Sequence, residues 1–92
     1  MSLNEDILLS LDLNLLLTFL VVFRERSVSG AAQHLRVTQP AVSGSLVRLR
    51  EFFGDPLFLR RDRKMQPTPK AQEIAEALLP AMQRIESVIR HP

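Results

Sequence analysis

The sequence predicts a mainly α-helical domain that has one short β-hairpin and ends in a long helix. Apolar residues recur every three or four positions over most of the chain, which is the spacing of amphipathic helices. Thr38 and Thr68 each precede such a stretch and have a proline one or two residues later, which is typical of helix starts. Between them, a short apolar run followed by a basic cluster at 57–64 favours a hairpin.

Length and composition limit the class of protein. Ninety-two residues, 46% of them hydrophobic, are enough for one small domain and exclude a disordered chain. There is no cysteine, so disulfides and thiolate metal sites are excluded, and we expect a cytoplasmic protein. Glu5 and Asp6 precede the first apolar run, which argues against a signal peptide, and the run 13–23 is too short to span a membrane.

Positive charge is concentrated in the middle of the sequence. The net charge is +2, but residues 24–70 hold ten bases against four acids, whereas residues 1–23 hold three acids and no base. A basic middle between neutral or acidic ends suggests a face that meets a polyanion such as nucleic acid. The alternative is an ordinary solvated face.

The first half of the chain predicts a flexible lead-in and two helices. Residues 1–10 are expected to be the lead-in, and a helix is expected at about 13–25, capped by Asp12 or Asn14. Its apolar residues cover more than one side, so we expect this helix to be buried on more than one side. It would form the back of the core, on which the other helices pack. A shorter helix is expected from Ser29, as N-cap, to Leu35.

The third helix has the clearest start, because Thr38 can act as its N-cap and Pro40 lies in its first turn. Its core face consists of Val42, Leu46, Leu49 and Phe53. Its opposite face carries Gln39, Pro40, Ser43, Gly44 and Val47. Together with the short helix and the turn at 36–37, this pattern predicts a helix-turn-helix whose second helix reads the major groove of DNA. The alternative is an ordinary amphipathic surface helix.

The stretch after Gly54 predicts a wing, that is, a hairpin with a basic tip. Phe58 would anchor it on the core, and the tip spans residues 60–64. Such a tip beside a helix-turn-helix can reach phosphates or the minor groove, although a solvated loop is the alternative. We therefore expect a winged helix-turn-helix, with a three-helix core and a short wing, at residues 11–67.

Residues 68–92 predict a long linker helix, with an apolar stripe that so small a body cannot cover. The stripe comprises Ile74, Leu78, Ala81, Met82, Ile85, Val88 and Ile89. Uncovered stripes of this kind often pair with a copy of themselves, so we expect a homodimer through this helix. Pro80 is expected to kink the helix near Glu76.

The chain resembles the N-terminal domain of LysR-type transcriptional regulators over about residues 11 to 90. The resemblance is carried by the Thr68-Pro69 helix start and by the run FLVVFRERSVSGAAQHLRVTQPAVSGSLVRLREFFGDPLFLR. It implies a winged helix-turn-helix with antiparallel pairing of two linker helices. It also implies an operator or promoter in double-stranded DNA as partner, and a small-molecule inducer bound by a C-terminal domain that is absent here. A higher oligomer of the full-length protein is compatible with it.

The resemblance also implies which residues meet DNA. Thr38, Gln39, Pro40 and Ser43 match recognition-helix positions, Arg60 matches the wing arginine, and Arg63 is the expected minor-groove side chain. The full expected set is Ser29, Thr38, Gln39, Pro40, Ser43, Gly44, Val47, Arg48, Arg50, Arg60, Arg61, Arg63 and Lys64. Many members have arginine where this chain has Gly44, and many have glutamate where it has Arg50.

Two other classes of function are alternatives to DNA binding. A protein-interaction module built on the long helix, without DNA binding, would explain the apolar stripe but not the basic segment. An enzyme is disfavoured because His34 and His91 are far apart in sequence, with no acidic pair or glycine-rich phosphate loop to support them. We expect no metal site, no cofactor and no membrane partner.

Overall fold

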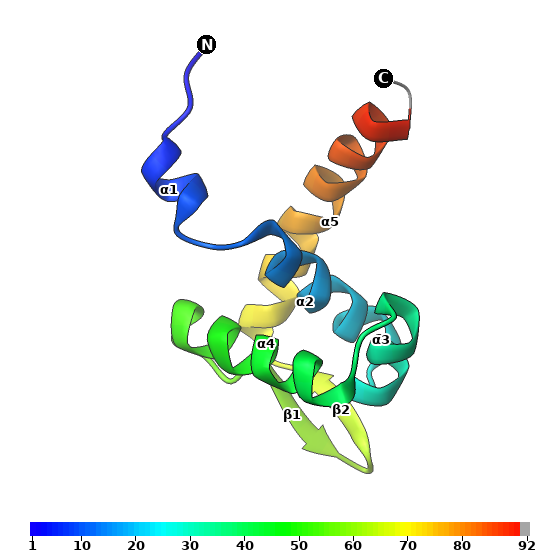
Figure 1. The fold of residues 1–92 in the computed structure, drawn as a ribbon. Helices are drawn as coiled ribbons and strands as arrows, with labels where there is room; N and C mark the ends of the chain where they lie inside the picture. Colours follow the sequence, from blue (N-terminus) through cyan, green and yellow to red (C-terminus); the bar gives the residue numbers. More distant parts are fainter. Residues whose placement is uncertain (91–92) are drawn as a thin grey trace.

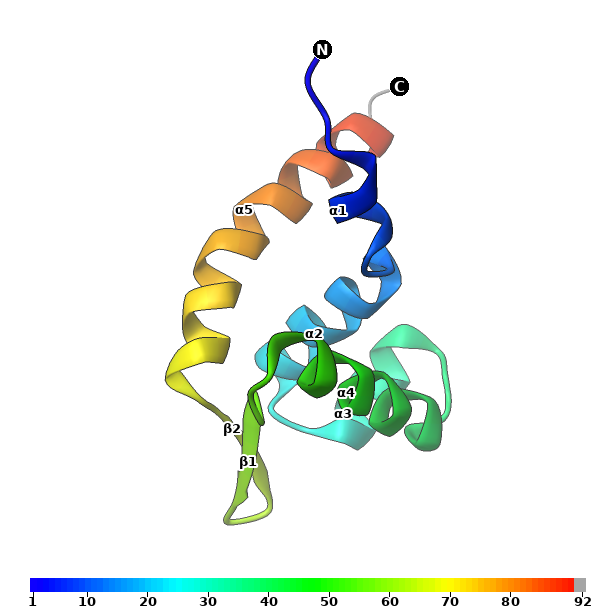
Figure 2. The ribbon, with the colours of Figure 1, turned by 90° about the vertical axis from the view of Figure 1, so that its left-hand side faces the viewer.

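The computed structural model describes residues 1–90. Its elements, in chain order, are α1 (Glu5–Leu9), α2 (Leu13–Glu25), α3 (Val28–Leu35), α4 (Gln39–Phe53), β1 (Phe58–Arg61), β2 (Lys64–Pro67) and α5 (Pro69–Arg90). Helices α3 and α4 and the hairpin lie at one end of the molecule, and α1 and the C-terminal half of α5 extend from the other (Figures 1 and 2). The predicted helical fold with a hairpin and a long last helix is confirmed.

One core holds α2, α3, α4, the hairpin and the start of α5 together. Its largest fully buried side chains are Phe19, Leu46, Leu49, Leu57, Val22 and Val42. The predicted core face of α4 is confirmed, since three of its members are buried and Phe53 packs against them half-buried. The faces that these helices leave outside the core are therefore available for other contacts.

Side-chain caps start the helices. The Asp12 carboxylate accepts a hydrogen bond from the Asn14 amide at 2.8 Å, so Asp12 caps α2. The prediction that Ser29 caps α3 was wrong, because the Ser27 hydroxyl accepts from the Gly30 amide at 3.0 Å. Ser27 has the extended backbone that a cap needs, whereas Ser29 already lies in the helix. The predicted cap of α4 is confirmed, with Thr38 Oγ1 accepting from the Ala41 amide at 3.2 Å.

The expected flexible lead-in over residues 1–10 contains a short helix. Residues 5–9 form the short helix α1, because Asn4 Oδ1 accepts a hydrogen bond from the Ile7 amide at 3.2 Å. Glu5 and Asp6 in the first turn also favour the positive end of the helix dipole. The apolar side chains of Ile7, Leu8 and Leu9 are exposed.

The wing is a four-residue-per-strand antiparallel hairpin in which Phe58 pairs with Pro67 and Arg61 with Lys64. Asp62 and Arg63 make the turn with φ angles of 51° and 66°, as a type I′ turn requires. Phe58 is buried against Phe19, with ring centroids 5.5 Å apart. The predicted anchoring role of Phe58 is therefore confirmed.

A second contact sets the direction of the wing. Arg26 ends α2 in the left-handed conformation, and its carbonyl accepts a hydrogen bond from the Met65 amide at 2.9 Å. Arg26 Nε in turn donates to the Phe23 carbonyl at 2.6 Å, while the guanidinium lies 4.9 Å from the centroid of the Phe23 ring. Strand β2 is thus tied to the end of α2 as well as to the core.

Helix α5 begins on the core and then leaves it. Ala71 and Ala75 are buried, whereas Val88 and Ile89 are 71% and 72% exposed. Pro80 lies inside the helix, and the kink expected near Glu76 stays a prediction. The last two residues of the predicted linker, at 91 and 92, lie outside the described residues.

Candidate nucleic-acid interface

Helices α3 and α4 form a compact helix-turn-helix. Arg36 ends α3 at a φ of 59°, and the Val37 amide donates to the Ala32 carbonyl at 3.0 Å, which closes the turn. Ala31 and Ala32 are fully or nearly fully buried, and their small side chains allow the neighbouring helices to approach closely. The turn therefore holds α4 across α3 with one long face in solvent.

The exposed face of α4 carries the residues that the sequence singled out. All of the following are exposed: Thr38, Gln39, Pro40, Ser43, Gly44, Val47 and Arg48. The side chains near the N-terminal end are short or flexible, and Gln39 and Ser43 can both donate and accept hydrogen bonds. This end of the helix can therefore approach the edges of base pairs closely.

Gly44 lies in the middle of that face and is not required by packing. A Cβ atom at this position would meet no atom of a neighbouring element within 4 Å. The glycine therefore leaves a flat, open spot on the surface rather than making room for a neighbouring element.

Besides Thr38, whose hydroxyl caps α4, two of the predicted contact residues are engaged within the protein. Arg50 is half-buried, and its Nε donates to the Pro56 carbonyl at 2.9 Å, so it stabilises the turn that follows α4. Ser29 is exposed on α3, with its hydroxyl 3.1 Å from that of Ser27. Arg50 also lies about 16 Å along the helix from Gln39, at 1.5 Å per residue. The structure therefore does not bring Arg50 together with the N-terminal end of α4.

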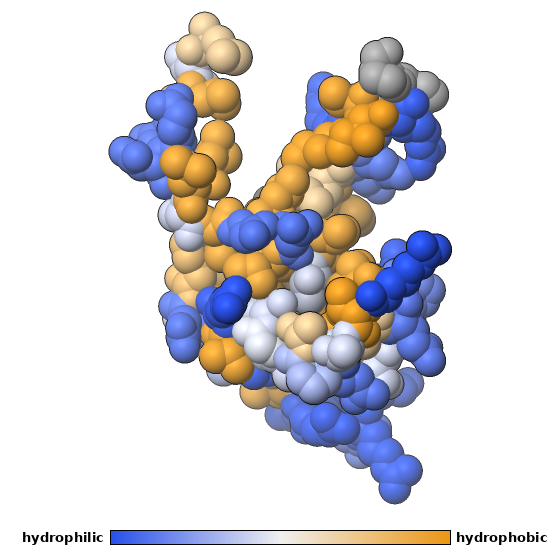
Figure 3. Space-filling model, in the orientation of Figure 1, coloured by the Kyte–Doolittle hydropathy of each residue, from blue (hydrophilic) through white to orange (hydrophobic). Residues whose placement is uncertain are grey.

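The wing carries a cluster of exposed basic side chains. Arg60, Arg61, Arg63 and Lys64 are all exposed around a single acid, Asp62. In the space-filling view the hydrophilic side chains of the wing form its protruding lower tip (Figure 3). The wing and α4 lie at the same end of the molecule, so a polyanion at that end would meet both.

Glu25, the last residue of α2, contacts a side chain on α3. Its carboxylate accepts a 2.7 Å hydrogen bond from Arg24 Nε and lies 3.3 Å from His34 Nε2. The hydrogen bond from Arg24, and secondarily the charge of His34, lower the pKa of Glu25. His34 is exposed, and in the described part of the chain no group of three His, Cys, Asp or Glu residues could hold a metal.

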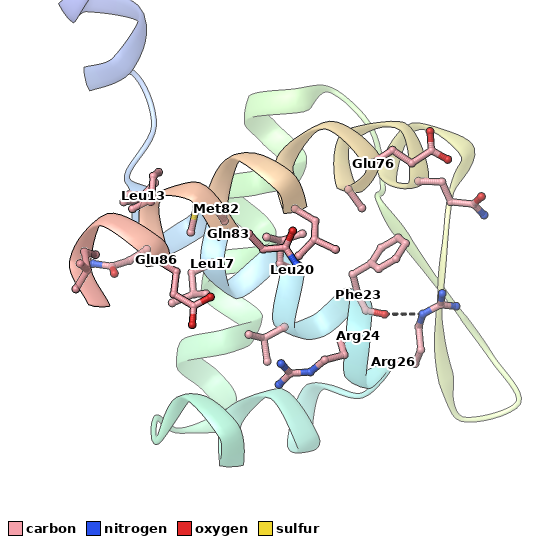
Figure 4. A pocket seen from close by; sticks show the side chains of 17 residues that line it. Leu13, Leu17, Leu20, Phe23, Arg24, Arg26, Glu76, Met82, Gln83 and Glu86 are labelled. Atoms are coloured by element: carbon pink, nitrogen blue, oxygen red, sulfur yellow. Dashed lines mark hydrogen bonds between the residues drawn. The ribbon is translucent and has the colours of Figure 1, made fainter. Parts of the chain in front are cut away.

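A second surface, an apolar groove of about 1020 Å³, lies between α2 and α5 (Figure 4). Its apolar lining consists of Leu13, Leu17, Leu20, Val21, Phe23, Ala75, Leu79, Met82, Ile85 and Ile89. The expectation that α2 is buried on more than one side is confirmed for its second half, because Phe19 and Val21, about 200° apart around the helix axis, are both buried. Near the start of α2, Leu13 and Leu17 are 48% and 40% exposed along this groove.

The groove divides the residues predicted for dimerisation. Met82, Ile85 and Ile89 line it, whereas Ile74 and Leu78 pack against the protein's own core. Ala81 and Val88 are exposed but outside the lining. The sequence reasoning missed Leu13, Leu17 and Leu79, although the four-residue spacing of the two leucines on α2 was a usable signal.

Known proteins share both this sequence pattern and this architecture. Residues 13–72 match the family described as bacterial regulatory helix-turn-helix protein, lysR family. The chain is 46% identical over 81 residues to the HTH-type transcriptional activator NahR of Pseudomonas putida, which covers 88% of this chain and 27% of that protein. It is 43% identical over 76 residues to nodulation protein D 2 of Sinorhizobium fredii, covering 83% and 24%.

Solved structures agree. A probable transcriptional regulator from Pseudomonas aeruginosa superimposes with a TM-score of 0.85 at 41% identity, over 89% of this chain and 28% of that one. The BenM DBD in a complex with benA site 1 DNA gives a TM-score of 0.79 at 25% identity, over 87% and 90%. The chain therefore belongs to the lysR family of bacterial regulatory helix-turn-helix proteins.

The relatives are transcriptional regulators, and the chain spans about a quarter of the length of the curated relatives it matches. Within residues 1–90, no helix is both long and apolar enough to cross a membrane.

Proposed function

We propose that this chain is the DNA-binding part of a transcription regulator that reads double-stranded DNA as a dimer. The observation that carries the proposal is the exposed face of α4 beside the basic wing at one end of the molecule. Arginine and lysine would supply most of the affinity through phosphates, and Gln39, Pro40 and Ser43 would supply base discrimination. The complex of the BenM DBD with DNA supports this assignment.

Substitution of Gln39 tests the base-reading role. Selection from a random DNA pool first supplies the preferred site, and the affinity of Gln39→Ala is then compared on that site and on random DNA. We expect a loss of about 1–3 kcal/mol on the preferred site and less on random DNA, because a side chain at a base edge discriminates whereas phosphate contacts do not. Gln33→Ala, an exposed glutamine on α3, is the matched control. Equal losses on both DNAs would contradict the role of Gln39.

The groove between α2 and α5 supports the dimer part of the proposal. An α5 from a second copy would cover Leu17, Leu79 and Ile89, which are all solvent-accessible in the single chain. The apolar stripe of α5 continues beyond the part of the helix that packs on the protein's own core. In a symmetric dimer, the same stripe on each copy can therefore contact the other copy. Each dimer would then present two copies of α4 to two half-sites.

The groove also supports a second candidate, a protein-interaction module that pairs through α5 without binding DNA. A gel shift on genomic fragments separates the two candidates. A shift that disappears with excess specific competitor supports DNA reading, and the absence of any shift supports the interaction module.

The remaining parts of the proposal concern the whole protein. The chain would act in the cytoplasm, where a bacterial chromosome lies, and without catalysis. An inducer-binding C-terminal domain, as the family resemblance implies, would account for the other three quarters of the relatives' length.

A further inference from the structure

A single hydroxyl joins the end of α4 to the start of α5. The Thr68 hydroxyl donates to Asp55 Oδ1 at 2.8 Å, and the same hydroxyl accepts a hydrogen bond from the Ala71 amide at 3.1 Å. Asp55 lies two residues after the last residue of α4, and Thr68 is the residue before α5. The proposed DNA-reading helix and the proposed dimer helix are therefore connected through two polar side chains.

A backbone contact strengthens the same junction. The Thr68 amide donates to the Leu57 carbonyl at 2.9 Å, and the Leu57 amide donates to Asp55 Oδ1 at 2.7 Å. Leu57 is fully buried and has a φ of 64°, a left-handed conformation that leucine rarely adopts. Asp55 Oδ1 thus accepts hydrogen bonds both from the unfavourable turn at Leu57 and from Thr68 at the start of α5.

Burial makes the side-chain hydrogen bond costly to lose. Thr68 is only 7% exposed, so its hydroxyl has little access to water if Asp55 is removed. A buried hydrogen-bond donor without a partner lowers the stability of the folded chain by more than a typical hydrogen bond adds to it. The hydrogen bond between Asp55 and Thr68 therefore favours one orientation of α4 relative to α5 over others.

We propose that Asp55 is a positioning residue that sets the direction of α4 relative to α5, and thereby the half-site spacing that the dimer accepts. This inference rests on the proposed function. If two α5 helices, each about 33 Å long, pair antiparallel as the family resemblance implies, the two α4 helices lie at opposite ends of the dimer. A small change in angle at Asp55 is amplified over that length, whereas the contacts of one α4 with one half-site stay the same.

The first experiment measures spacing preference. The affinities of the native chain and of Asp55→Ala are compared on duplexes with the preferred half-site pair, with that pair shifted by one base pair, and with one half-site. We expect the native chain to lose about tenfold on the shifted pair and Asp55→Ala to lose about threefold or less, with single half-site binding unchanged. Asp55→Asn, which keeps the acceptor oxygen, should restore the native preference. A merely structural role would weaken binding to all three duplexes alike and would overturn the inference.

The second experiment needs no DNA. The chain has no cysteine, so Glu51→Cys on α4 and Ser87→Cys on α5 provide two spin-label sites, both exposed. The labelled chain is diluted with unlabelled chain, so that each measured distance lies within one subunit. We expect the distance distribution to broaden in Asp55→Ala and to stay narrow in Asp55→Asn. An unchanged distribution in Asp55→Ala would overturn the inference.

The two experiments separate this inference from the proposed function. If no duplex binds specifically but the distribution broadens in Asp55→Ala, the DNA-reading proposal fails and Asp55 still sets the helix direction. If the native chain discriminates spacing and Asp55→Ala discriminates equally well, the DNA-reading proposal stands and the role of Asp55 fails.

Discussion

At the scale of single residues, Gly44 is the point at which α4 departs from the arginine that many members of the family carry. The open space around it means that a longer side chain would extend from the exposed face without a clash. Glycine inside a helix also costs about 1 kcal/mol relative to alanine. Glycine at this position is therefore suboptimal for helix stability. The effect on DNA binding of a side chain at position 44 can be tested by substitution.

Gly44→Arg should raise DNA affinity by adding one phosphate or guanine contact. The logarithm of the binding constant should then fall more steeply with the logarithm of salt concentration, by about 0.9 per added phosphate contact. Gly44→Ala is the control, because it should raise the free energy of unfolding by about 1 kcal/mol and leave the salt dependence unchanged. An identical slope in Gly44→Arg and the native chain would show that position 44 does not face the phosphates.

At the scale of elements, the wing combines a strained turn with a charge. Asp tolerates the left-handed conformation at position 62 better than most residues, but the arginine at position 63 has no such advantage. A glycine would fit the second position of this turn better. The presence of Arg63 at the tip is therefore explained by its charge more readily than by hairpin stability.

Arg63→Gly should separate the two effects. Thermal unfolding should show that the free energy of unfolding rises by up to about 1 kcal/mol, because glycine adopts a φ of this sign without steric cost. The salt dependence of DNA binding should flatten by about 0.9, because one phosphate contact is lost. Arg63→Lys keeps the charge and should change neither quantity much; a flattened slope in that variant would argue against simple charge pairing.

Several elements were predictable from the sequence because their signals are local. The cap and proline of α4 and the start of α5 at Thr68 act within a few residues of where they stand. The cap of α3 was assigned to the wrong serine, because two serines with the same chemistry stand two residues apart. Only the extended backbone of Ser27 distinguishes them.

At the scale of the whole molecule, the groove between α2 and α5 predicts which substitutions report on dimerisation. Leu78 packs against the protein's own core, so a charge at that position would report on folding instead. Ile89 is 72% exposed in the single chain and lines the groove, so it is the better position.

Ile89→Glu should convert the dimer to monomers without unfolding the chain. A glutamate at an exposed position costs the single chain little, but burial against a second copy would remove its charge from water. Analytical ultracentrifugation measures the association state, and circular dichroism checks the helix content. Ser87→Glu, exposed on the same helix but outside the groove lining, is the matched control. A dimer that persists in Ile89→Glu would place the pairing surface elsewhere.

The sequence by itself determined the order of the elements from α2 to α5, the cap and core face of α4 and the basic character of the wing, because each depends on neighbouring residues. Only the tertiary structure decided which distant groups meet. It placed Met65 against Arg26, Thr68 against Asp55, and an exposed side of α2 beside α5. Such contacts depend on how complete helices and strands pack against one another. The spacing of residues along one element does not predict that packing.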